Sequence, residues 1–78
     1  MNVEYTVLEL LASICGTKKV KKDLTINLIE EGYLDSMRIV ELLTEMEDEF
    51  DIEIPLDTFI PENFNTAEKI INYIKSNI

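Results

Sequence analysis

The sequence has no histidine, and a single cysteine, Cys15, among its 78 residues. Without histidine the chain lacks the commonest general base, and neither a Ser-His nor a Cys-His nucleophile can be assembled from it. One thiol cannot form an internal disulfide, and alone it cannot complete a zinc or redox site. We therefore expect a protein that is not itself an enzyme, with a Cys15 that is partly buried and unreactive.

Basic residues are scarce as well. Seven lysines and arginines stand against sixteen aspartates and glutamates, which gives a formal net charge of −9. Such a chain repels the phosphates of nucleic acid, so we expect basic protein surfaces as its partners. The carboxylates do not have the spacing of an EF-hand loop, and only weak, diffuse binding of divalent cations is expected. Since the sequence contains no bilayer-spanning apolar run and no signal-peptide pattern, we expect no membrane insertion and a cytoplasmic location.

Three segments have the apolar periodicity of amphipathic helices. The first covers residues 3–15 and ends at Gly16, a typical residue just beyond a helix C-terminus. The second covers residues 36–50. The third covers residues 66–76, with a capping box expected at Asn65 and an apolar stripe that continues to Ile78. The expected core side of the second helix consists of Ile39, Leu42, Leu43, Met46 and Phe50.

The connections between these helices carry weaker signals. The four lysines between residues 18 and 22 are expected to form a solvated loop, and the apolar residues 23–29 to fold over the bundle through one helical turn near Asp23. Pro55 and Pro61 indicate a loop with one short helix, over Leu56–Ile60 or Pro61–Phe64. The sequence predicts an all-α protein: an up-down four-helix bundle of three longer helices and one short third helix, monomeric, in a single domain over 1–78.

The turn that leads into the second helix is the most informative stretch. Gly32 can adopt the positive φ that a sharp turn requires, and Asp35 is a good N-cap because its carboxylate accepts hydrogen bonds from the first turn. Ser36 is then placed at the start of a helix with its hydroxyl in water. A phosphate ester on that hydroxyl would meet free N–H groups and the positive end of the helix dipole.

The solvent side of the second helix is strongly acidic. It collects Met37, Glu41, Thr44, Glu45 and Asp48, with Arg38, Val40 and Glu47 at its borders. The carboxylates are i,i+3 and i,i+4 neighbours and repel one another by a few tenths of a kcal/mol each. Because this repulsion destabilises the helix, binding to a basic partner explains the acidic face better than exposure to water alone.

Gly-Tyr-Leu-Asp-Ser-Met at 32–37, followed by Ile-Val-Glu-Leu-Leu and then Glu-Phe-Asp-Ile-Glu-Ile-Pro at 49–55, resembles the acyl carrier proteins over about residues 24–75. The resemblance implies that Ser36 receives a 4′-phosphopantetheine arm from coenzyme A through a phosphopantetheinyl transferase. It also implies that acyl ligases, synthases or acyltransferases bind the second helix through basic docking surfaces. The predicted partner-binding residues are Asp35, Met37, Arg38, Val40, Glu41, Thr44, Glu45, Glu47 and Asp48.

The resemblance leaves the cargo open, with acyl groups of fatty-acid or lipid biosynthesis as the first expectation and D-alanine as the alternative. The stretch at 49–55 resembles carriers of fatty-acid and lipid biosynthesis. The stretch at 30–37 and the run from Asn63 to Ile71 look more like D-alanyl carrier proteins of cell-wall modification. Arg38 departs from the pattern of both kinds of carrier. This departure affects the expected choice of partner enzyme more than the expected modification of Ser36. Two rival interpretations need no modified serine: an acidic adaptor that binds a basic protein, and a small helical mimic of DNA charge.

Overall fold

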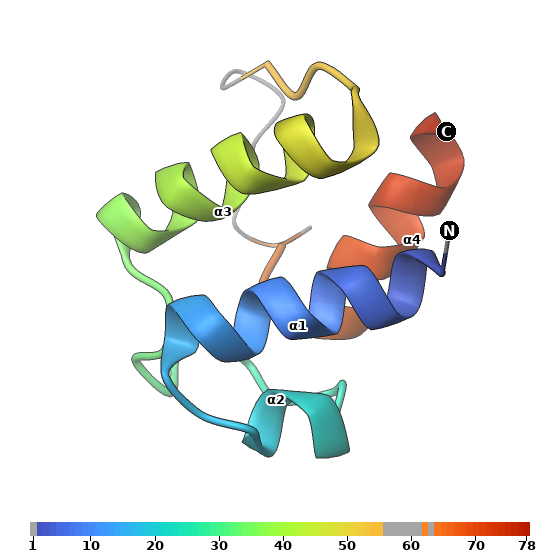
Figure 1. Cartoon of the computed structure of the whole chain (residues 1–78). Helices are drawn as coiled ribbons and strands as arrows, with labels where there is room; N and C mark the ends of the chain where they lie inside the picture. Colours follow the sequence, from blue (N-terminus) through green and yellow to red (C-terminus); the bar gives the residue numbers. More distant parts are fainter. Residues whose placement is uncertain (1, 56–61, 63) are drawn as a thin grey trace.

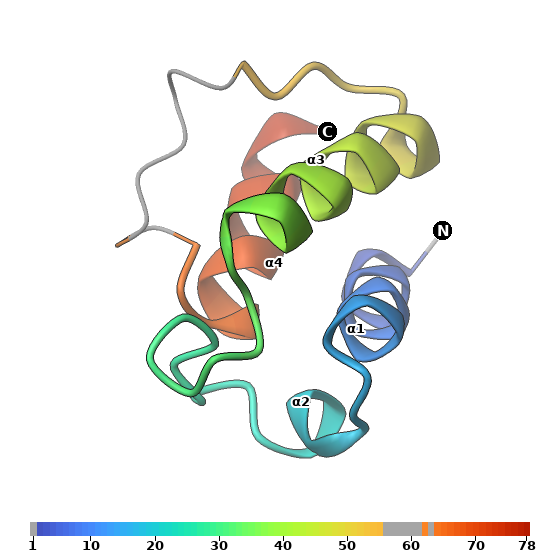
Figure 2. The same ribbon diagram turned by 90° about the vertical axis from the view of Figure 1, so that its left-hand side faces the viewer.

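A computed structural model describes residues 2–55, 62 and 64–78, and these residues form four helices. They are α1 (Val3–Cys15), α2 (Lys19–Lys22), α3 (Ser36–Phe50) and α4 (Ala67–Asn77). α1 contacts each of the other three, with α3 on one side of it and α2 on the other (Figure 1). In the view turned by 90°, α2 again lies below α1, and α1 lies to the side of α3 and α4 (Figure 2). The predicted all-α helical bundle is confirmed.

The ends of the helices follow from capping. The Asn2 side chain accepts a hydrogen bond from the Tyr5 N–H at 2.9 Å, and α1 ends at Gly16, whose φ of +70° is the left-handed conformation expected there. The bounds predicted for α1 and α3 are both confirmed. The cap predicted for α4 at Asn65 is wrong, because Thr66 Oγ1 accepts the hydrogen bond from the Lys69 N–H instead.

The core is an aliphatic cluster with contributions from every helix. Its buried residues are Val7, Leu11, Val20, Leu28, Leu34, Leu42, Leu43, Met46, Ile54, Phe64, Ala67, Ile70, Ile71 and Ile74. In the described part of the chain no polar or charged residue is fully buried. The apolar stripe predicted for α4 holds as far as Ile74 but not to the end of the chain, since Ile78 is 63% exposed. None of the helices in the described ranges has the length and apolarity needed to cross a bilayer.

The connections depart from the prediction in two places: the lysine segment forms a helical turn, and the helical turn expected near Asp23 is absent, since residues 23–27 contain only turns and a bend. The lysine segment is not a loop: residues 19–22 form the single turn α2, which ends before Asp23. Val20 is fully buried and anchors this turn, while Lys21 pairs with Glu9 of α1. The prediction that residues 23–29 fold over the bundle is confirmed, because Leu28 is buried and its apolar neighbours are half-buried. The short helix predicted over 56–60 or 61–64 lies largely outside the described residues, which include only 62 and 64 of it.

Backbone hydrogen bonds join the connection before α3 to Asn65 and to the first turn of α4. The Leu28 N–H donates to the Asn65 carbonyl at 2.7 Å, and the Glu68 N–H donates to the Leu24 carbonyl at 3.2 Å. These bonds join two parts of the chain that are about forty residues apart. The second bond explains the shifted cap of α4. A capping box at Asn65 requires the Glu68 N–H to donate to the Asn65 side chain, but this N–H donates to the Leu24 carbonyl instead.

Candidate functional site

The chain enters α3 through a turn that the core holds in place. Gly32 has φ +79°, which supplies the positive value that the sequence predicts at this position. The N–H groups of Tyr33 and Leu34 both donate to the Leu28 carbonyl, at 2.9 and 3.0 Å. The Leu34 side chain is only 2% exposed and ties the turn to the core. The backbone that leads into Asp35 and Ser36 is therefore held in one position.

Asp35 caps α3 as the sequence predicts. Its Oδ1 accepts a hydrogen bond from the Arg38 N–H at 2.9 Å, and its carbonyl accepts from the Ile39 N–H at 2.9 Å. Ser36 is the first residue of the helix and is exposed. The hydroxyl of Ser36 is thus located in solvent at the positive end of a fifteen-residue helix. This position can accept an anionic group, because a phosphate there is favoured by the helix dipole and the unpaired N–H groups of the first turn.

The solvent side of α3 carries most of the predicted partner-binding residues. Met37 is 83% exposed and Val40 is 50% exposed, which is unusual for apolar side chains next to carboxylates. Glu41, Thr44, Glu45 and Asp48 are exposed along the same helix. The structure therefore brings two apolar side chains and a row of acids together, immediately after Ser36.

Glu47 differs from the other predicted partner-binding residues. It is half-buried, and its Oε2 accepts a hydrogen bond from the Ile54 N–H at 2.8 Å. Its backbone carbonyl also accepts from the Ile52 N–H at 3.3 Å and from the N–H of Asp51, the residue that ends the helix. Glu47 thus holds the chain as it leaves α3. Nothing in the sequence signalled this contact, since it depends on Ile54 turning into the core.

Arg38 lies at the Ser36 end of α3 and is exposed. Its Nη1 donates to the Tyr33 carbonyl at 3.5 Å, so the guanidinium is directed back along the turn that precedes the helix. The Arg38 charge also interacts electrostatically with Cys15 on α1. Burial raises the pKa of the Cys15 thiol above its ordinary value, and the Arg38 charge lowers it in part. Cys15 is half-buried, which confirms the partial burial expected from the sequence.

The described residues do not include a group of carboxylates and thiols placed to hold a metal ion. The chemistry available at this site is that of an exposed hydroxyl at a helix start. Such a hydroxyl is suited to covalent attachment of a phosphate-linked group. 4′-Phosphopantetheine fits this geometry because it is attached through a phosphate ester.

Comparison with known proteins agrees with this geometry. Residues 6–74 match the family described as the phosphopantetheine attachment site. The chain is 42% identical over 71 residues to the D-alanyl carrier protein of Latilactobacillus sakei, with 91% of each chain covered. It is 40% identical over 76 residues to that of Enterococcus faecalis, with 97% of each covered. It is 39% identical over 74 residues to that of Bacillus subtilis, with 95% of each covered. With a family match over nearly its whole length and relatives of this similarity, the chain belongs to the acyl carrier protein family, whose members carry 4′-phosphopantetheine.

Proposed function

We propose that this carrier bears its arm on Ser36 and that its cargo is D-alanine, held as a thioester. The observation that carries the proposal is the exposure of Ser36 as the first residue of α3, directly after the Asp35 cap. The chain itself performs no catalysis in this proposal. It acts as a substrate for enzymes that attach the arm, load the cargo and remove it.

Attachment of the arm exchanges one phosphate bond for another. The Ser36 oxygen forms a bond to the phosphorus nearer the pantetheine of coenzyme A, the diphosphate bond breaks, and adenosine 3′,5′-bisphosphate leaves. The serine proton goes to a base of the transferase in this proposal. The resulting phosphodiester carries one negative charge at the N-terminus of α3, where the helix dipole stabilises it.

The choice of D-alanine is supported by the relatives. The proteins compared above, at about 40% identity over almost the whole chain, are all named D-alanyl carrier protein. The second candidate cargo is a fatty acyl chain, favoured by the stretch Glu-Phe-Asp-Ile-Glu-Ile-Pro at 49–55, which resembles carriers of fatty-acid synthesis. The extent of the similarity to D-alanyl carriers outweighs this one stretch.

The attachment site is tested by mass. The apo protein is incubated with coenzyme A and a broad-specificity phosphopantetheinyl transferase, and its intact mass is then measured. We expect a gain of one phosphopantetheinyl group in the wild type and none in Ser36→Ala. Ser13→Ala is the matched control, because Ser13 is also an exposed serine, on α1, and this variant should gain the group. A wild type that gains nothing would favour an unmodified acidic adaptor, and an equal gain in Ser36→Ala would place the arm elsewhere.

The cargo is tested by competition on the holo form. The holo protein is offered D-alanine with ATP and a D-alanine-loading ligase, and separately a fatty acid with ATP and an acyl ligase that acts on carriers. We expect loading with D-alanine that hydroxylamine removes, as it does other thioesters, and much slower loading with the fatty acid. Faster loading with the fatty acid would overturn the choice of D-alanine while leaving the Ser36 site intact.

A further inference from the structure

Four charged residues of α3 lie on one stripe of its surface. At about 100° per residue, Arg38, Glu41, Glu45 and Asp48 fall within about 80° of one another around the helix axis. All four are exposed. Along the axis they cover about 15 Å at 1.5 Å per residue. The stripe therefore has one positive charge at the end nearest Ser36, followed by three negative charges. We call it the mixed-charge stripe.

Among the described residues, no carboxylate neutralises the positive charge of Arg38. Glu41 is within reach of Arg38 as an i,i+3 neighbour, yet the guanidinium donates to the Tyr33 carbonyl, a neutral acceptor, at 3.5 Å. Within the described ranges the ion pair formed is that of Lys21 with Glu9, on the far side of α1, and Arg38 pairs with no carboxylate. A guanidinium has five N–H donors, so most of those on Arg38 are available to a partner.

The mixed-charge stripe adjoins apolar side chains that a partner can cover. Met37 is 83% exposed and borders the stripe on the helix surface, and Val40 is 50% exposed beside it. Protein interfaces commonly combine a few desolvated apolar anchors with a charged rim that selects the partner. The end of α3 that carries Ser36 has both features.

We propose that Arg38 is the specificity-determining residue of this surface, and that the loading enzyme presents a carboxylate opposite it and basic side chains opposite Glu41, Glu45 and Asp48. A uniformly basic docking surface would place a like charge against Arg38, and like charges at an interface reject a wrong partner. The order of charges also fixes the direction in which the carrier docks, with the enzyme's carboxylate nearest Ser36. The inference rests on the proposed function, since it concerns the enzyme that loads the arm.

Charge variants of Arg38 test the inference. The measurement is the Kd of the holo carrier for the ATP-dependent D-alanine ligase of the same organism, with the melting temperature of each variant recorded beside it. We expect Arg38→Lys to bind within about twofold of wild type. Arg38→Gln should bind about fivefold more weakly because one charge pair is lost, and Arg38→Glu more than tenfold more weakly because like charges then meet.

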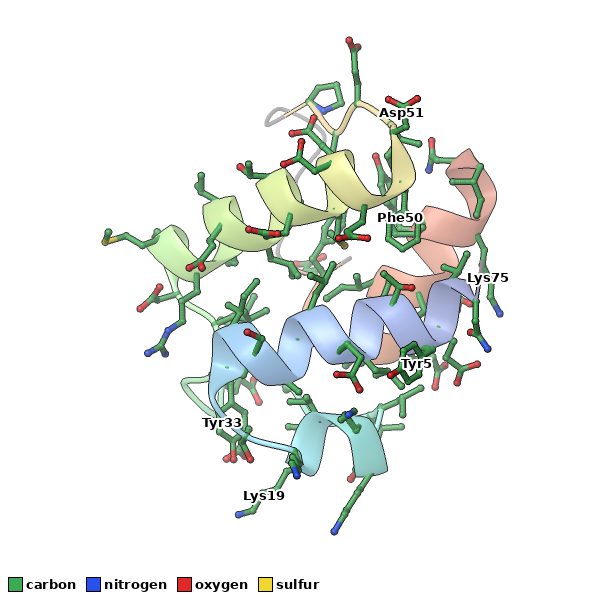
Figure 3. The ribbon with its side chains drawn as sticks, viewed as in Figure 1. Tyr5, Lys19, Tyr33, Phe50, Asp51 and Lys75 are labelled. Atoms are coloured by element: carbon green, nitrogen blue, oxygen red, sulfur yellow. The ribbon has the colours of Figure 1, made fainter. Side chains whose placement is uncertain are left out.

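Lys75→Glu is the control for net charge. Lys75 is an exposed base near the end of α4, at the opposite end of the molecule from Tyr33 (Figure 3). This variant changes the total charge as Arg38→Glu does, and it should bind within about twofold of wild type. An Arg38→Glu carrier that binds as tightly as wild type, or more tightly, would overturn the inference. Equal losses in Arg38→Gln and Arg38→Glu, together with a lower melting temperature, would also overturn it, because Arg38 would then act only as a brace on Tyr33.

The predicted partner group can be found by charge exchange. Exposed acids of the ligase are changed one at a time to lysine and tested with Arg38→Glu, and one of them should restore binding at least fivefold. If no substitution restores it, the inference fails. These results are separate from the proposed function: a wild type that the ligase does not load contradicts the choice of cargo, whereas loading with no Arg38 effect contradicts only this inference.

Discussion

The hydrogen bond between the Glu47 side chain and the Ile54 N–H should be a measurable part of the stability of this protein. It joins α3 to the segment that follows it at 2.8 Å, and Ile54 is only 4% exposed. Glu47→Ala removes the acceptor and leaves the Ile54 N–H in a partly buried position without a partner. This variant should weaken the attachment of residues 52–55 while leaving the rest of α3 in place.

The size of the effect follows from the kind of bond. Loss of a hydrogen bond to a charged acceptor, with one partner left unsatisfied, costs about 1–3 kcal/mol. Because Glu47 is half-buried and water can replace part of the bond, we expect the lower half of that range, about 1–2 kcal/mol. For a domain of this size, that is a fall in melting temperature of roughly 4–16 °C.

Two measurements check this prediction. Urea unfolding gives the change in free energy, and amide hydrogen exchange should show the Ile54 N–H exchanging faster in Glu47→Ala. Glu45→Ala is the matched control, since Glu45 is an exposed glutamate of the same helix, and its loss should leave stability unchanged or raise it slightly by relieving like-charge repulsion. If Glu47→Ala unfolds at the same urea concentration as Glu45→Ala, and Ile54 exchange is unaltered, the bond contributes nothing and the reasoning is refuted.

Three further predictions concern stability and charge. Asp51 ends α3 with φ +52°, so Asp51→Gly should raise the free energy of unfolding by about 0.5–1 kcal/mol in urea, and a loss of stability would contradict a strained backbone there. Hydrogen bonds from the Thr25 hydroxyl and N–H lower the pKa of Asp23, so its stabilising effect is present above the pKa of the unfolded carboxyl and is lost as the pH falls through the folded value. Thr25→Ala should move the Asp23 midpoint upward in an NMR titration, and an unmoved midpoint would show that the hydroxyl bond has no role. Added sodium chloride should raise the melting temperature because it screens the −9 charge, whereas an unchanged melting curve would argue against strong self-repulsion.

The elements that the sequence predicts best are those with strong local signals. α1 and α3 have long apolar periodicity and clear end residues, and both have the bounds predicted for them. The site belongs to this group. The positive φ of Gly32, the Asp35 cap and the exposure of Ser36 all depend on residues within one turn of each other, so local chemistry determines them.

The predictions that failed depend on contacts between distant parts of the chain. A four-residue helix such as α2 has no periodicity to detect, and it is stabilised by the burial of Val20 against α1. The cap of α4 moved from Asn65 to Thr66 because the Glu68 N–H, which a cap at Asn65 would need, donates to the Leu24 carbonyl. The hydrogen bond between Glu47 and Ile54 was not predicted at all, because Glu47 has the same chemistry as its exposed neighbours and only the position of Ile54 in the core distinguishes it.

The positions of the two chain ends have a consequence for building larger proteins. The beginning of α1 and the end of α4 lie at the same end of the molecule, whereas α3 begins with Ser36 at the opposite end (Figure 1). A second polypeptide fused at either terminus would therefore be distant from the serine and from the turn that supports it. Copies of this fold could be joined in tandem by short linkers, each still presenting its hydroxyl outward. Fusion to a fluorescent or affinity module should leave modification of Ser36 unimpaired.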